Sequence, residues 1–292
     1  EAKAGWQAVG PASYSFALTA STSNVNFVNQ IASGLCISGK KTNETGAAVM
    51  DWNITLIGTN LYGAAVSLNA TTADDGSYIF TGLFAGSYTV AEEAKVGWEV
   101  VGPASYTFDL VASKSDVDFV NRVVSGLSIS GKKINETGAA KKDWNITLTG
   151  TTLDGVAVSR KAVTAVDGSY TFTGLFAGGY TVAEESKAGW QSVGPASYSF
   201  SLMSGSINVD FINKIISGLA ISGRLVTNSG VAKSGWNISL SGTTLDGNAV
   251  TKETATASDG SYSFTGLFAG DYIVSCESRT QWPVIDPATR SH

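Results

Sequence analysis

The sequence predicts an all-β protein made of tandem seven-stranded β-sandwiches arranged as a rod. The stretch DGSYxFTGLFAGxYxV occurs three times, at residues 75–90, 167–182 and 259–274. Its Asp-Gly pair fits a tight hairpin turn, and the alternating aromatic residues that follow are typical of a half-buried strand. Charged residues make up only 15% of the chain and glycine is abundant, which favours short strands and turns over helices.

The repeat has a period of 92 residues, measured between the aspartates of the Asp-Gly pairs, Asp75, Asp167 and Asp259. Residues 34–125 and 126–217 are two complete repeats, and residues 218–292 are an incomplete third repeat that lacks the final strands. Residues 1–33 instead match the closing third of a repeat. The linkers between repeats are short and are not rich in Gly, Ser or Pro, so we expect a stiff rod.

Each complete repeat is predicted to form seven short strands bounded by Gly, Asn, Asp or Ser. Seven strands in about ninety residues fit an immunoglobulin-like sandwich, in which one face of each sheet is buried. In the second repeat we expect the strands near residues 127–133, 144–149, 157–164, 170–173, 180–184, 198–202 and 209–213.

The tryptophans recur every 46 residues, at Trp6, Trp52, Trp98, Trp144, Trp190, Trp236 and Trp282. Their flanking sequences alternate between GWxxVGP and WNI. This alternation favours two core tryptophans in each repeat over a half-length repeat or a sugar-binding platform.

The ordered motifs VDFVNRVVSGLSISGKK, DWNITLTGTT and DGSYTFTGLFAGGYTVAEE resemble the SdrD B-like repeat. This repeat belongs to the Cna B-type, prealbumin-like sandwiches of bacterial and archaeal surface proteins. The resemblance covers essentially the whole chain and implies a stalk, adhesin, surface layer or fibre outside the cell. Related modules often hold calcium in an acidic loop after the first strand. Here Asn43-Glu44-Thr45-Gly46 is too poor in carboxylates for such a cation, so we expect no calcium site.

The wider family also includes domains crosslinked by an isopeptide bond between Lys and Asn or Asp, assisted by a buried acid. By position, the resemblance implies as candidates Lys41 or Lys133, Asn121 or Asn213, and Glu92 or Glu184. The third repeat has Leu225 in place of the lysine and Cys276 in place of the glutamate, so the crosslink cannot be general. The favoured interpretation is that the lysine stems lie along an apolar edge with their amines in water.

The two ends of the chain complement each other. The third repeat keeps the pattern through Val274 and then loses it, while residues 14–18 and 25–29 match its two missing strands. We hypothesise that residues 1–30 of one subunit complete the third domain of its neighbour, with donor strands that bury Tyr14, Phe16, Leu18, Val25 and Phe27. Because the two surfaces differ, this contact would propagate as a head-to-tail homopolymer. The alternative is that the chain was cut from a longer array.

The two cysteines, Cys36 and Cys276, lie in the first and last repeats, too far apart in a rod to pair within one chain. In the polymer Cys36 would approach Cys276 of the next subunit, and an intersubunit disulfide is predicted as the alternative to two free thiols. Six sequons could carry N-linked glycans, or could simply form a polar strand face, at Asn43, Asn53, Asn69, Asn135, Asn145 and Asn237.

The composition argues against several functional classes. The net charge of −5 provides no basic surface for nucleic acid, and no apolar run reaches the roughly 18 residues of a membrane span. No basic-then-apolar leader opens the chain, which is therefore expected to be mature or excised. His292 is the only histidine, and neither a metal cluster nor a phosphate loop is recognisable, so no catalysis and no cofactor are expected. The sequence predicts a structural subunit of an extracellular filament, sheath or surface layer. The alternative is a tandem-repeat stalk of a cell-surface adhesin that does not self-assemble.

Overall fold

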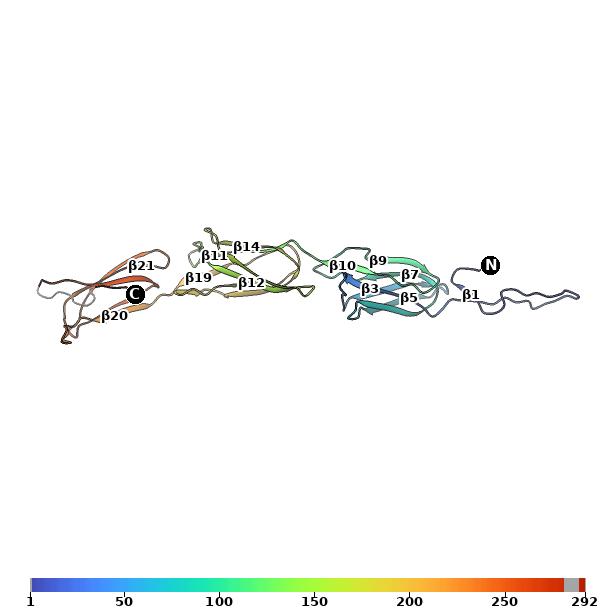
Figure 1. The fold of residues 1–292 in the computed structure, drawn as a ribbon, viewed down its shortest axis with the longest axis horizontal. Coiled ribbons are helices and arrows are strands. Elements are labelled where there is room, and N and C mark those ends of the chain that lie inside the picture. Colours follow the sequence, from blue (N-terminus) through green and yellow to red (C-terminus); the bar gives the residue numbers. More distant parts are fainter. Residues whose placement is uncertain (1, 281–288, 292) are drawn as a thin grey trace.

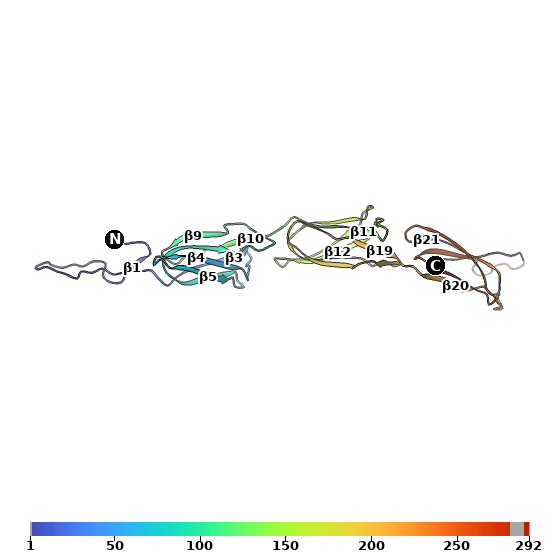
Figure 2. The same cartoon turned by 180° about the vertical axis from the view of Figure 1, so that it is seen from behind.

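The computed structural model describes residues 2–280 and 289–291 and consists of strands and loops, which confirms the predicted all-β class. Three sandwiches follow one another along a single axis, and residues 9–28, here called the arm, extend beyond the first sandwich (Figure 1, Figure 2). We call residues 34–125 Domain 1, residues 126–217 Domain 2 and residues 218–292 Domain 3. No helix long and apolar enough to cross a membrane occurs in the described part.

Domain 1 is a sandwich of two four-stranded sheets. The first sheet has the order β6-β3-β10-β8, formed by β6 (Ser77–Leu83), β3 (Leu35–Asn43), β10 (Phe119–Val123) and β8 (Trp98–Val100). The second has the order β5-β4-β7-β9, formed by β5 (Ala65–Thr71), β4 (Asn53–Asn60), β7 (Gly86–Glu92) and β9 (Ser105–Leu110). Alternating residues such as Ile54 and Leu56 face the other sheet and are fully buried, as the period of two predicts.

Domain 2 repeats this arrangement with two strands more than the predicted seven. Its strands are β11 (Leu127–Asn135), β12 (Asn145–Thr152), β13 (Ala157–Val163), β14 (Ser169–Leu175), β15 (Gly178–Glu184), β16 (Trp190–Ser192), β17 (Ser197–Leu202), β18 (Ser206–Asn208) and β19 (Phe211–Ile215). The two additional strands are β16 and β18. Each has only three residues, too short to show an alternating pattern in the sequence.

Domain 3 is an open sandwich. Its strands are β20 (Leu219–Arg224), β21 (Asn237–Thr244), β22 (Ala249–Ala255), β23 (Ser261–Leu267), β24 (Gly270–Cys276) and β25 (Thr289–Ser291). In the described residues β20 pairs only with β23, because no strand there takes the place of β10 or β19. β25 pairs with β24 at the position that β17 takes on β15. The expectation that both final strands are missing is therefore wrong for the first of them, which is present over three residues.

The boundaries between domains share one hydrogen-bond pattern. Between Domains 1 and 2, the Val124 N–H donates to the Gly97 carbonyl at 2.9 Å, and the Ala177 N–H donates to the Val124 carbonyl at 2.7 Å. The boundary between Domains 2 and 3 repeats these bonds with Ile216, Gly189 and Ala269. The constant geometry makes the rod continuous.

The same pattern joins the N-terminal segment to Domain 1. Strands β1 (Trp6–Ala8) and β2 (Asn29–Ile31) pair with each other in the register of β8 and β10. The Ala32 N–H donates to the Gly5 carbonyl at 2.8 Å, and the Ala85 N–H donates to the Ala32 carbonyl at 2.8 Å. Gly5 has a φ of 77°, and a Cβ there would lie 2.7 Å from Leu61, so the close approach requires glycine. Residues 2–33 thus sit on Domain 1 as the end of a preceding domain would.

Candidate functional site

Lys41 of β3 and Glu92 of β7 form an ion pair inside Domain 1. The Lys41 Nζ lies 3.1 Å from Glu92 Oε2, and the two side chains are 0% and 2% exposed. The Lys41 amine also lies over the Trp52 ring, 4.6 Å from its centroid. The expectation that these lysine amines reach water is therefore wrong. Lys41 lies on the inward face of β3 with Ile37, and the facing sheet closes over it.

Asn121 of β10 lies beside this ion pair. β10 runs parallel to β3, with Phe119 opposite Lys41, and Asn121 follows Phe119 on the same buried face. The Asn121 Oδ1 has no hydrogen-bond partner among the described residues. An amine, a carboxyl group and a carboxamide are thus enclosed in one apolar core, where unpaired polar atoms are costly. Buried ionisable groups of this kind make the cluster a candidate reactive site.

Domain 2 contains the equivalent cluster. The Lys133 Nζ lies 3.1 Å from Glu184 Oε2, and Lys133 is again 0% exposed. Ser192 of β16 connects the other two groups, because its hydroxyl donates to Glu184 Oε1 and lies 3.4 Å from the Oδ1 of Asn213. Sequence reasoning missed Ser192. Its equivalent in Domain 1 is Val100, so the repeat carries no signal for it.

The protonation states suit an amide-forming reaction. Burial lowers the pKa of Lys41 and of Lys133, and burial raises the pKa of Glu92. Both shifts favour the uncharged forms. An uncharged lysine amine can attack the Asn121 Cγ, the carboxyl group can carry the amine proton to the leaving nitrogen, and ammonia departs as the amide bond forms.

Domain 3 has neither the lysine nor the glutamate at the equivalent positions. Cys276 pairs with Ile238 on β21 as Glu92 pairs with Ile54 on β4, and Leu225 occupies the lysine position. Cys276 and Cys36 are both free thiols that are partly buried. Burial raises the pKa of the Cys276 thiol, which makes it a poorer nucleophile at neutral pH.

The predicted donor residues lie in the arm and are exposed. Tyr14 packs against Phe27 with ring centroids 5.4 Å apart, and the Tyr14 hydroxyl donates to the Asn26 carbonyl at 3.0 Å. Residues 10–28 form no regular strand, so the strands expected at 14–18 and 25–29 are not formed in the single chain, apart from Asn29 at the start of β2. The exposed predicted donors are Tyr14, Phe16, Leu18, Val25 and Phe27.

Domain 3 exposes the surface that these donors would cover. Leu219 is 43% exposed, whereas its equivalent Leu127 is 5% exposed. In Domain 2 the buried Tyr170 hydroxyl donates to the Val209 carbonyl of the closing segment. The equivalent Tyr262 is only half-buried, and the residue that matches Val209 is Val25 of the arm.

The prediction of two core tryptophans in each repeat holds for one of the two, because Trp98 and Trp190 are only half-buried. Trp52, Trp144 and Trp236 are buried, while Trp98 packs edge-on against Trp52 with ring centroids 5.5 Å apart. Trp6 is exposed where its domain is incomplete. Trp282 and His292 lie outside the described residues.

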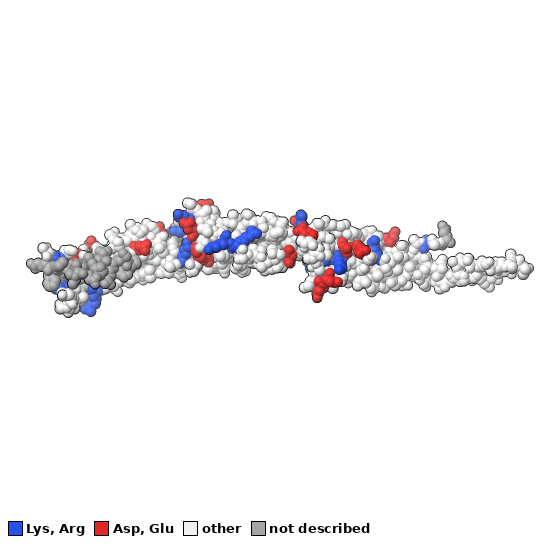
Figure 3. All heavy atoms as spheres, viewed as in Figure 1, with Lys and Arg blue, Asp and Glu red and all other residues white. Residues whose placement is uncertain are grey.

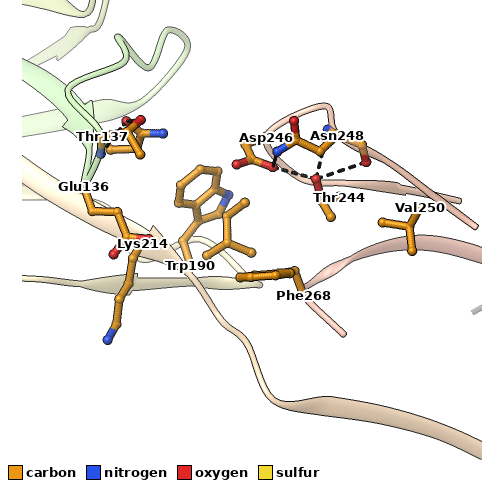
Figure 4. A pocket seen from close by; sticks show the side chains of 11 residues that line it. Glu136, Thr137, Trp190, Lys214, Thr244, Asp246, Asn248, Val250 and Phe268 are labelled. Carbon is orange, nitrogen blue, oxygen red and sulfur yellow. Dashed lines mark hydrogen bonds between the residues drawn. The ribbon is translucent and has the colours of Figure 1, made fainter. Parts of the chain in front are cut away.

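A cavity of about 190 Å³ marks the boundary between Domains 2 and 3 (Figure 4). The Trp190 ring projects into it from Domain 2, toward the loop of Domain 3 that carries Asp246 and Asn248. The Asp246 carboxylate already accepts bonds from the Thr244 hydroxyl and, at 3.0 Å, from the Asn248 amide. The cavity is therefore a feature of the domain boundary.

The loop at the position where related modules often hold calcium is stabilised by the side chain of Asn43. Asn43 Oδ1 accepts bonds from the backbone N–H groups of Thr45 and Ala47 at 3.0 and 2.9 Å. No group of three or more His, Cys, Asp or Glu residues placed to hold a metal ion occurs among residues 2–280 and 289–291.

The sequons differ in access to solvent. Asn69 is exposed on β5, whereas Asn135 is buried and its Oδ1 accepts three hydrogen bonds from residues 137 and 139. The remaining four, at Asn43, Asn53, Asn145 and Asn237, are half-buried. In natively glycosylated protein, we expect glycopeptide mapping to find a glycan at Asn69 and none at Asn135. A glycan at Asn135 with Asn69 unmodified would contradict this prediction.

The comparisons with known proteins support the fold. The sequence profile of the second β-sandwich domain of the NOMO1-like subunit of the BOS complex matches residues 216–290. No protein of curated function matches the sequence. The Bacillus anthracis TIE protein has a similar structure, with a TM-score of 0.50 and 18% identity over 91% of this chain. This chain spans about half of that protein, 51% of its length.

Two pilin structures resemble the chain more weakly. A variant of BcpA, the major pilin subunit of Bacillus cereus, has a TM-score of 0.42 and 12% identity, covering 88% of this chain and 95% of its own. A streptococcal ancillary pilin has a TM-score of 0.32 and 13% identity, covering 88% of this chain and 94% of its own. Together with the strand topology described above, the similarity to the TIE protein shows the tandem β-sandwich fold.

Proposed function

We propose that the protein is a structural subunit of an extracellular filament that assembles head to tail, with the arm of one copy completing Domain 3 of the next. The observation that carries the proposal is the seating of residues 2–33. They match the closing strands of a sandwich and bind to Domain 1 through the same hydrogen bonds that join Domain 1 to Domain 2, and no sandwich that they close lies among the described residues. A second copy of the chain provides such a sandwich in Domain 3. Among the described residues its β20 lacks a partner strand on the matching side.

The arm has the composition of a segment that is to be buried. Residues 4–39 contain no charged residue, and the protruding tip is accordingly free of charge in the space-filling view (Figure 3). The closing segments inside the rod differ from it in this respect. Asp118 and Arg122 of Domain 1, for example, correspond to Asn26 of the arm and Gln30 of β2. An uncharged strand can enter an acceptor without leaving unpaired charges behind.

The acceptor edge on β24 is only weakly occupied in the single chain. β25 pairs with β24 at three positions, whereas β17 pairs with β15 at six. Residues 13–18 of the arm match the six-residue strand. In the proposed assembly they replace β25, and residues 25–29 add a parallel strand beside residues 225–227, which directly follow β20.

The buried clusters suit a protein that bears mechanical load. In our proposal Lys41 bonds to Asn121, and Lys133 bonds to Asn213, so that each shaft domain is closed covalently between its first and last strands. A tandem stalk that carries an adhesin would use the same bonds. Self-assembly is what separates the two functions.

An intersubunit disulfide stays a prediction. Across the boundary between Domains 1 and 2, Glu92 is the equivalent of Cys276, and Ser128 is the equivalent of Cys36. Asn121 lies beside Glu92, and Ser128 comes seven residues after Asn121. Extended chain of that length spans about 20 Å, while a disulfide needs Cα atoms within roughly 7 Å. Assembly as proposed does not depend on this bond. Non-reducing electrophoresis tests it, and a single monomer band from assembled material would overturn it.

The proposed assembly is tested with the purified chain. Electron microscopy at increasing protein concentration is expected to show filaments one sandwich thick, with uninterrupted domains. A synthetic peptide of residues 1–33, added in excess, should fill Domain 3 and shorten them, while a scrambled peptide should not. Chains that stay monomeric at all concentrations would contradict self-assembly and favour the stalk.

A further inference from the structure

We propose that the arm of one copy enters Domain 3 of another copy in one fixed register. We call the sandwich completed in this way the joint. Unlike Domains 1 and 2, the joint cannot crosslink itself. The inference rests on the proposed function. Its partner is a second copy of the chain. In the joint, Asn29 of one copy meets Leu225 and Cys276 of the other.

The register follows from pairings that the chain already makes twice. In Domain 2, Phe211 lies opposite Lys133, and Asn213 lies two residues further along the same parallel pair. The corresponding residues are Phe27 of the arm and Asn29 of β2, and Leu225, which directly follows β20, corresponds to Lys133. The register of the arm is fixed before it binds, because β1 and β2 are already paired in the register of β16 and β19.

The joint retains one member of the reactive cluster and loses the other two. Asn29 lies exposed on β2, whereas its equivalents Asn121 and Asn213 are buried beside a lysine and a glutamate. In Domain 3 those two positions hold Leu225 and Cys276. An inserted Asn29 therefore meets an apolar side chain and a thiol whose pKa burial raises, and neither supplies an amine.

This difference makes the joint mechanically weaker than Domains 1 and 2. Domains 1 and 2 can be closed by amide bonds, while each joint depends on strand pairing and apolar burial alone. Denaturant is then expected to divide a filament into single chains whose Domains 1 and 2 remain crosslinked.

Restoring the cluster tests the register. The double variant Leu225→Lys/Cys276→Glu should attach the new amine at position 225 to Asn29 of the neighbour, with loss of ammonia. Boiled, reduced samples should then run as a ladder of multimers, and mass spectrometry should find the peptide containing position 225 joined to the peptide containing position 29. Adding Asn29→Ala should abolish the ladder and leave the filaments intact.

A second variant keeps the test decisive if the first fails to fold or if Domains 1 and 2 do not crosslink. Ser192 contacts both Glu184 and Asn213, so their equivalents Cys276 and position 29 should lie close together in the joint. Asn29→Cys in a Cys36→Ser background should give a ladder of multimers that reductant removes. Filaments that yield only monomers with this variant would overturn the register. Absence of filaments from the unmodified chain would instead refute the proposed function.

Discussion

A single carboxylate at position 27 is expected to abolish assembly, while the same change at position 28 is not. Phe27 and Val28 are equally exposed in the single chain, at 60% and 58%. Their equivalents in Domain 2 differ, because Phe211 is buried in the core and Ile212 faces solvent. Phe27→Asp should therefore place a charge in the core of the acceptor, and Val28→Asp should place it in water.

The expected effect is large. Losing a buried phenylalanine costs about 3–5 kcal/mol, and burying an unpaired carboxylate adds to that cost. Since about 1.4 kcal/mol corresponds to a tenfold change, affinity should fall at least about 100-fold. Sedimentation and electron microscopy of the two variants measure this. Equal loss of filaments in both, or in neither, would contradict insertion of the arm as proposed.

The second prediction concerns the covalent closure of Domain 1. Glu92→Gln removes the proton carrier and the buried partner of Lys41. The intact mass of the wild-type chain should be lower than the sequence mass by two ammonia molecules, and that of the variant by one. Removing one partner of a buried pair costs about 3 kcal/mol, which on a domain of this size lowers Tm by roughly 10 to 20 °C.

The adjacent glutamate provides the control. Glu93 pairs with Lys95 near the surface at 3.1 Å, and it accepts a bond from the Asn53 N–H that a glutamine can also accept. Glu93→Gln should keep both crosslinks and lose little stability, because exposed ion pairs contribute about 1 kcal/mol or less. A wild-type mass equal to the sequence mass would show that the clusters are ion pairs only.

Local sequence patterns and contacts between distant residues determine different parts of this structure. The period of 92 residues, the Asp-Gly turns and the alternating strands are local patterns, and they specified the sandwiches and their order. Strands β16 and β18 were not predicted, since three residues cannot show a period and their pairing depends on distant partners. β25 was missed for a related reason, because it continues a pairing after the repeat pattern is lost.

The environment of the lysines could only be decided by the tertiary structure. Lys41 alternates correctly with Ile37, yet a long side chain on an apolar strand often reaches water at the sheet edge. Whether it does so depends on Glu92 of β7, 51 residues away, and on Trp52, which directly precedes β4 of the same opposite sheet. The sequence by itself determined the repeats and the mismatch between the two ends of the chain. The packing of the two sheets determined which polar side chains are enclosed, because burial depends on residues that meet only after folding.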